Sequence, residues 1–267
     1  MCYILAMNTK TLSPRGLSVI NQYIHFKIGN AIAPVPYFNN KTVRARAALR
    51  VNIGKGSPKE IFEEIRDIAT KENLNIDRLT NEEISSIMKK NHLGIDCSGF
   101  AYYVLNAESV EMDKGPLEKH LHFIQCHGFF GKIACAFRPV ENCGVATFAH
   151  DHNSRVLPLK ETQPGDIITI TTKNIDSNQT DRNHILVIHQ VEYQNFLPIT
   201  LHYSHAIFYP TDGVPGGGIK QGIIEIVDAE KSLVEARWIE NSLEWKSNPL
   251  FARSQISLTE LRRLRWF

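Results

Sequence analysis

The sequence lacks any segment suited to a membrane. No apolar run reaches the roughly 18 residues that a membrane-spanning helix requires. The apolar stretch at residues 1–7 has no basic region before it and is shorter than most secretory signal cores. We therefore expect a protein without an integral membrane segment, either cytoplasmic or exported by a non-classical route.

An excess of charge of one sign is also lacking. The chain has 30 lysines and arginines against 28 aspartates and glutamates, for a formal net charge of +2. This balance gives no electrostatic reason to expect nucleic acid or an anionic membrane as a partner. The one basic group of note, Lys41, Arg44, Arg46 and Arg50, is explained by the solvated face of a helix. Nothing in the composition indicates an oligomeric state.

Cysteines are too few and too irregularly spaced for a disulfide framework. Their number is odd, no two stand in a C-x-x-C pair, and a chain of 267 residues buries enough surface to fold without cross-links. We therefore expect reduced thiols, at least one of them reactive. The cysteines are Cys2, Cys97, Cys126, Cys135 and Cys143.

Helical signals dominate the first 90 residues. A proline after Ser13 opens a helix through about residue 26, and residues 31–40 are expected to be loop or extended. Ser57 with Glu60, and Thr80 with Glu83, form two capping-box patterns ahead of apolar residues at helical spacing. An apolar helix at 97–107 follows.

Period-two patterns begin after residue 166 and predict an antiparallel sheet. The expected strands are 167–172, 184–191, 200–207, 222–227 and 235–239. A third capping-box pattern, Ser257 with Glu260, predicts a short terminal helix. Helices followed by strands indicate an α+β fold, which we assign to a single domain over 1–267.

The helix at 97–107 begins with a sequence suited to a nucleophile. Asp96 precedes Cys97, and Ser98 and Gly99 follow. The unpaired N–H groups and positive dipole end of a first helical turn favour an anion, so we expect a depressed pKa for the Cys97 thiol. The backbone N–H of Cys97 is a candidate oxyanion donor.

A thiol nucleophile needs an imidazole base and a group that orients it. His184, which opens the apolar run of the second strand, is the candidate base. His205 and His202 on the next strand are candidates for the orienting group. Because their positions differ in parity, at most one of them faces His184.

Several motifs together resemble the NlpC-type papain-like cysteine peptidases, which mostly cleave bacterial cell-wall peptides. The resemblance covers residues 94–107 and 156–227, with a Pro-Tyr element within 31–40. The motifs, in the family's order, are VPY, GIDCSGFAYYVL, ETQPGDIITI, NHILVIHQV and YSHA.

The resemblance implies a papain-like fold, with Cys97 as nucleophile, His184 as base and His205 as the orienting residue in preference to His202. Tyr37 matches a tyrosine at the family's active site, and an ordinary loop aromatic is the alternative for it. Asp96 and Ser98, beside the cysteine, complete the candidate substrate-binding residues, although Asp96 also suits a helix cap. The implied substrate is a peptidoglycan stem peptide, and no metal or cofactor is implied.

Two insertions set the chain apart from the family pattern. A helical insertion at 41–92 separates Tyr37 from the cysteine, and an insertion at 108–155, with one expected helix near 117–124, precedes the sheet. The helix 97–107 and the sheet form the expected catalytic core.

Three other functions stay open. An amidase, deamidase or acyltransferase acting on a small amide or lipid would use the same three residues. A non-enzymatic binding module is the second. The third is a zinc-binding module, since histidines and cysteines are dense in the middle of the chain but match no common zinc spacing. The residues concerned are His120, His122, Cys126, His127, Cys135, Cys143, His150 and His152.

Overall fold

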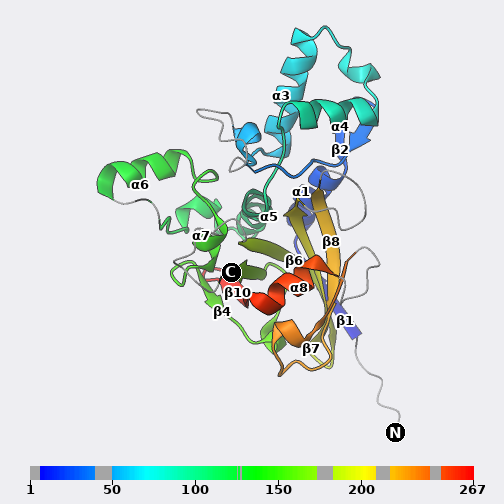
Figure 1. Cartoon of the computed structure of the whole chain (residues 1–267). Coiled ribbons are helices and arrows are strands. Elements are labelled where there is room, and N and C mark those ends of the chain that lie inside the picture. The colour runs from blue at the N-terminus through cyan, green and yellow to red at the C-terminus, as the bar shows by residue number, and fades with distance from the viewer. Residues whose placement is uncertain are drawn as a thin grey trace.

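The computed structural model describes residues 7–39, 50–124, 126, 128–172, 183–208, 217–240 and 248–267. Within them, an antiparallel sheet of eight strands lies against helices (Figure 1), so the predicted α+β class is confirmed. The strand order is β4-β10-β5-β6-β7-β8-β9, and β1 pairs with the far half of β6. The strands are β1 (Met7–Thr11), β4 (Ser154–Val156), β5 (Ile167–Thr171), β6 (His184–Gln194), β7 (Leu197–Ile207), β8 (Gly218–Glu225), β9 (Arg237–Glu240) and β10 (Leu258–Leu264).

The helices begin where the sequence places caps. The Ser57 and Thr80 side chains both close capping boxes, as predicted, and Asp96 caps the helix that starts at Cys97 by accepting from the backbone N–H of Gly99. The helices are α1 (Pro14–Ile24), α3 (Pro58–Lys71), α4 (Asn81–Lys90), α5 (Cys97–Glu111), α6 (Gly128–Phe137), α7 (Val145–Ala149) and α8 (Pro249–Ile256). Short 3₁₀ turns are η1 (Arg50–Ile53), η2 (Ile76–Arg78), η3 (Leu117–Lys119), η4 (Leu159–Glu161) and η6 (Leu233–Glu235).

Each face of the sheet is buried in its own core. On β6, Ile185 and Val187 join the core that includes α1 and α5, whereas Leu186 and Ile188 join a second core that includes Leu250 of α8. This division follows from the alternation of side chains along a strand. Residue parity therefore decides which core a side chain enters on β7 and, as far as the bulge after Ile188, on β6.

The two insertions differ in their structure. The described part of 41–92 contributes α3 and α4, which form a lobe at the top of Figure 1, where α4 packs on a hairpin of β2 (Phe26–Ile28) and β3 (Ala31–Ala33). The insertion 108–155 contributes η3, α6 and α7. The helix expected near 117–124 is wrong, because only the turn η3 forms there. Of the basic group noted above, Lys41, Arg44 and Arg46 lie outside the described residues, and Arg50 lies in η1 and pairs with Glu141.

The predicted terminal helix is wrong. Residues 258–264 form β10, which pairs with β5 and β4. Leu261 and Leu264 are buried, and the buried Arg262 donates to Ser154 while Arg263 donates to Asp166. These partners lie about a hundred residues away in sequence, and their contacts outweigh the local capping signal of Ser257 and Glu260.

The expectation that all cysteines are reduced is also wrong. Cys126 and Cys135 form a disulfide within the insertion 108–155. Cys97 and Cys143 are free and buried, and Cys2 lies outside the described residues. An odd number of cysteines is compatible with one disulfide, and the sequence argument did not consider this case.

Candidate active site

Cys97 is the first residue of α5 and is almost fully enclosed. Its side chain is 6% exposed, and its sulfur accepts a hydrogen bond from the backbone N–H of Ile185 on β6. This contact places the thiol beside the first residues of that strand, next to His184. The start of α5 and the start of β6 therefore meet where the sequence predicts a nucleophile and its base.

His184 contacts His205 and not His202. The His184 Nε2 and His205 Nδ1 atoms are 2.7 Å apart, the two rings are nearly perpendicular, and both side chains are buried. The His202 Nε2 atom lies 2.7 Å from the Glu192 carboxylate instead. Between the two histidines left open by the sequence, the structure brings His205 to His184.

A buried carboxylate continues this contact. The His205 Nε2 atom lies 2.8 Å from Glu240 Oε2 on β9, and the Tyr203 hydroxyl donates to the same oxygen at 3.0 Å. We call His184, His205 and Glu240 the histidine–carboxylate chain. It crosses the sheet from β6 to β9 on the face of the α8 core, to which Tyr203 also belongs.

Burial governs protonation at the site. Desolvation, followed by the Asp96 charge, raises the pKa of the Cys97 thiol to about 12, and the charges of Lys55 and Arg253 oppose this only in part. Desolvation, the His205 ring and Arg253 lower the pKa of His184 well below its usual value. The expected depression of the thiol pKa is therefore wrong, because burial outweighs the helix dipole.

A second buried polar group lies behind the nucleophile. Lys55, which is 6% exposed, donates from Nζ to Asp96 Oδ1 at 2.9 Å, to Ser98 Oγ at 2.6 Å and to the Cys143 carbonyl at 3.0 Å. We call these four residues the Lys55 cluster. An ammonium group has three protons, and each has an acceptor here.

Asp96 and Ser98 use their hydrogen bonds within the Lys55 cluster. The Ser98 hydroxyl donates to Asp96 Oδ1 at 3.0 Å, and the same oxygen accepts from the Gly99 N–H at 2.7 Å. A substrate-binding role for Asp96 and Ser98 stays a prediction that these contacts do not support. Their contacts fit the positioning of the first turn of α5.

Tyr37 reaches the site through backbone contacts. It forms a parallel bridge with Ile95, two residues before Cys97, and its ring meets Phe208 edge-on. Burial raises the pKa of the Tyr37 hydroxyl, and the Cys97 thiol contributes to this increase. A phenol that stays protonated beside a thiol is a possible hydrogen-bond donor, and the substrate role of Tyr37 stays a prediction.

Three charged residues at the site escaped the sequence analysis. Lys55 stands between two glycines just before a capping box, Glu240 lies two residues after the buried Trp238, and Arg253 lies in α8. Lys55 contacts Asp96, 41 positions further along the chain, and Glu240 contacts His205, 35 positions before it. Contacts over such separations leave no local pattern in the sequence. The one available signal was Glu240, an acidic residue directly after the predicted strand 235–239.

Those of the dense histidines and cysteines that the structure describes are not gathered into a metal centre. Cys126 and Cys135 are disulfide-bonded, His120 stacks on Trp266, and the Cys143 carbonyl serves the Lys55 cluster. His127 lies outside the described residues. The rings of His122, His150 and His152 lie 5.0–6.0 Å apart. In the part of the chain that the structure describes, no group of such residues is arranged to hold a metal ion.

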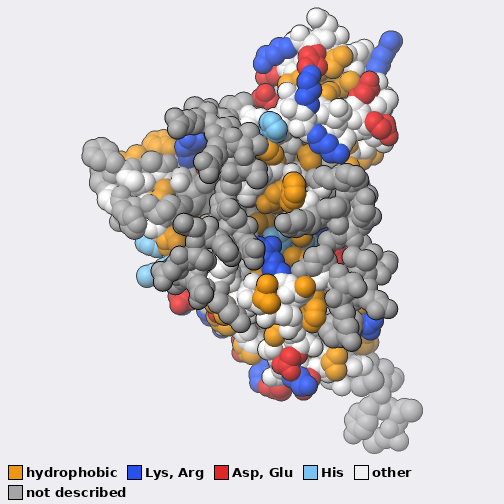
Figure 2. All heavy atoms as spheres, viewed as in Figure 1, with side chains coloured by type: hydrophobic (Ala, Val, Ile, Leu, Met, Phe, Trp, Pro, Cys, Tyr) orange, Lys and Arg blue, Asp and Glu red, His pale blue; other side chains and the backbone are white. Residues whose placement is uncertain are grey.

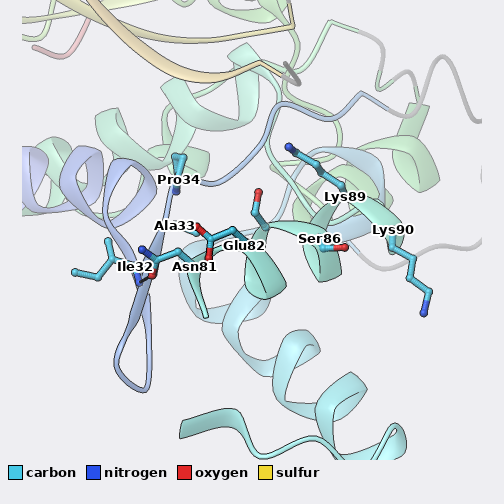
Figure 3. A pocket seen from close by; sticks show the side chains of 9 residues that line it. Ile32, Ala33, Pro34, Asn81, Glu82, Ser86, Lys89 and Lys90 are labelled. Carbon is cyan, nitrogen blue, oxygen red and sulfur yellow. Dashed lines mark hydrogen bonds between the residues drawn. The ribbon is translucent and has the colours of Figure 1, made fainter. Parts of the chain in front are cut away.

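The surface offers a hollow and a separate groove. In Figure 2, hydrophobic and basic side chains gather in the middle of the face, where the surface is hollowed. The groove lies between α4 and β3 in the upper lobe, where Figure 3 shows Glu82 and Lys89 among its lining residues. None of the predicted site residues lines this groove.

Comparison with known proteins adds no relative. The chain matches no family model, no curated protein and no solved structure. Across the described ranges, no helix combines the length and the apolar character needed to cross a membrane.

Proposed function

We propose that this chain is a cysteine hydrolase with a papain-like fold that cleaves a peptide or amide bond. The observation that carries the proposal is the meeting of three residues from distant parts of the chain: the Cys97 thiol beside the start of β6, and His184 bonded to His205 at 2.7 Å. All three side chains are buried. A thiol, an imidazole and an orienting group in this order form the arrangement that cysteine hydrolases use.

The reaction follows from these positions. His184 takes the proton of Cys97, and the sulfur attacks the carbonyl carbon of the substrate. The tetrahedral intermediate collapses as His184 returns that proton to the leaving amine, and a thioester remains on Cys97. Water, deprotonated by His184, then attacks the thioester; the acid product leaves and the thiol is restored. The Cys97 N–H is the oxyanion donor, and Tyr37 is the second candidate.

The substrate we propose is a peptidoglycan stem peptide. Support for it comes from the ordered motifs around Cys97, His184 and His205 that resemble the NlpC-type peptidases. Small amides and lipids are the competing class, and they share the same thioester step.

The test uses the rate at which iodoacetamide alkylates Cys97, read by peptide mass spectrometry. We expect His184→Ala to slow this rate about 10²- to 10⁴-fold, because the thiol loses the base that accepts its proton. His202→Ala is the matched control, since it removes a carboxylate-bonded histidine outside the site. Equal rates in wild type and His184→Ala would refute the hydrolase proposal.

The substrate is tested separately. Incubation with muropeptides and with a panel of small amides, analysed by mass spectrometry, should give stem-peptide cleavage that Cys97→Ala abolishes. Turnover of small amides alone would replace the cell-wall assignment with that of an amidase.

A further inference from the structure

We propose that Glu240 is a fourth member of the site, a positioning residue that fixes which nitrogen of His205, and through it of His184, carries the proton. The inference rests on the proposed function, because a positioning residue is useful only if His184 acts as a base. Its test, which reads the protons of the histidine rings, does not require that function. It depends on two contacts between buried groups: Glu240 Oε2 to His205 Nε2 at 2.8 Å, and His205 Nδ1 to His184 Nε2 at 2.7 Å.

The proton positions follow from what each group is able to do. An ionised carboxylate only accepts, so the hydrogen bond to Glu240 places the His205 proton on Nε2. The Nδ1 atom of a neutral His205 then accepts, and the His184 Nε2–H donates to it. His184 Nδ1 is left with a free lone pair, which is what a base for the thiol needs.

The opposite arrangement would disable the base. If His205 carried its proton on Nδ1, that N–H would donate to His184 Nε2. His184 would then hold its own proton on Nδ1, and no lone pair would be available to the thiol. An ionised Glu240 carboxylate disfavours this state, because it has no proton to give to His205 Nε2.

The strand between His205 and Glu240 leaves room for this arrangement. Tyr203 on β7, Gly222 on β8 and Glu240 on β9 stand in one cross-strand row. A Cβ atom at Gly222 would lie 2.3 Å from the Tyr203 hydroxyl oxygen. The absence of a side chain at Gly222 therefore lets the tyrosine lie across β8. Its hydroxyl donates to Glu240 Oε2 at 3.0 Å, the same oxygen that contacts His205.

Among the described residues, three other ionisable groups lie near the histidine–carboxylate chain. Lys220 stands opposite His205 in the β7–β8 ladder, Arg253 of α8 acts on His184, and the Cys97 sulfur at the start of α5 accepts from the Ile185 N–H, one residue after His184. When His184 takes the thiol proton on Nδ1, its Nε2–H keeps the bond to His205. An ionised Glu240 lies two hydrogen bonds from the new imidazolium and would stabilise it.

The direct test is the ¹⁵N NMR spectrum of the histidine rings. In wild type we expect His205 protonated on Nε2 with a bare Nδ1, and His184 protonated on Nε2. Glu240→Ala should mix the tautomers of both rings. A wild-type His205 protonated on Nδ1, or a Glu240→Ala spectrum unchanged for both histidines, would overturn the inference.

Alkylation of Cys97 gives the second readout. We expect Glu240→Ala to slow iodoacetamide labelling about 10- to 100-fold, as losses of outer-shell partners do. Glu240→Gln, whose amide oxygen still accepts from His205, should retain the tautomers and restore part of the rate; a rate equal to that of Glu240→Ala would count against the tautomer argument. Glu192→Ala is the matched control, because it breaks the His202–Glu192 pair on the same two strands and should change neither readout.

The two proposals fail in different ways. If Glu240→Ala does not fold, the wild-type spectrum and Glu240→Gln still decide the inference. Tautomers as expected together with an unreactive Cys97 would refute the hydrolase and leave the role of Glu240 intact. Tautomers other than expected with a reactive Cys97 would do the reverse.

Discussion

The Lys55 cluster and the histidine–carboxylate chain are both buried and both adjoin Cys97, yet they differ in what their protons do. Lys55 gives each of its three protons to a fixed acceptor, and its partner Asp96 caps α5. The chain consists of two imidazoles and one carboxylate, and an imidazole is able to exchange donor and acceptor roles. A buried ion pair with every donor satisfied holds a structure in place. A buried pair of imidazoles held by a carboxylate is suited to fixing which ring nitrogen carries a proton.

Their origins also differ. The cluster joins both insertions to α5, since Lys55 comes from 41–92 and the Cys143 carbonyl from 108–155. The chain comes entirely from the sheet. We infer that the insertions secure the position of Cys97, whereas the sheet sets the protonation of its base.

The largest expected effect breaks the Lys55 cluster. Lys55→Met should lower the free energy of unfolding by about 3–5 kcal/mol, because Asp96 is left buried without its cation. Urea denaturation followed by circular dichroism measures the change.

Lys90→Met is the matched control for Lys55→Met. Lys90 pairs with Glu72 at 3.1 Å on the exposed surface, and breaking such a pair costs at most about 1 kcal/mol. If the two variants lose the same stability, the distinction between the cluster and an ordinary surface pair is lost.

The next effect is pH dependence from His184. The pKa of His184 is lower in the folded chain than in the unfolded chain. Below about pH 6.5 this histidine therefore binds a proton in the unfolded chain but stays neutral in the folded chain. The stability is fully present above that pH and falls below it, by about 1.4 kcal/mol per pH unit for each such group.

Unfolding in urea at pH 7.5, 6.5 and 5.5 tests this effect. His184→Gln should show a shallower loss toward acid than wild type. His189, whose pKa burial lowers to about 4, adds a second loss that both proteins share. Parallel curves for wild type and His184→Gln would contradict the assignment.

The smallest expected effect concerns Arg253. Its charge lowers the pKa of both Cys97 and His184 but is not the main cause of either shift. Arg253→Gln should raise the pKa of the thiol and of the imidazole together, by about half a unit each, and so move the pH profile of Cys97 alkylation toward higher pH. The alkylation rate measured from pH 5 to 10 in both proteins tests this. A profile that moves toward lower pH would reverse the sign that we assign to this charge.

Local signals predicted much of the fold and part of the site. The caps at Ser57, Thr80 and Asp96, the helix at Cys97 and the strands between 167 and 240 depend on residues a few positions apart. Strand parity also separated His205 from His202 as alternatives. These features are local, so the sequence contains them directly.

Features that depend on distant residues were missed. Lys55 pairs with Asp96 across 41 positions, and β10 forms because Arg262 and Arg263 meet partners near residues 154 and 166. The prediction of a low thiol pKa failed for the same reason. The sequence shows that Cys97 begins a helix, but it does not show the burial that raises the pKa of the thiol. Roles of Cys97, His184, His205 and Tyr37 stay predictions until the experiments are done.

Gly222 places a constraint on how this protein evolves. A Cβ there would lie 2.3 Å from the Tyr203 hydroxyl oxygen and 2.8 Å from the backbone carbonyl oxygen of Ile239, so it would meet both the tyrosine and the next strand. We expect glycine to be retained at 222 in descendants of this sequence. A smaller residue at 203 would remove only one of the two obstacles.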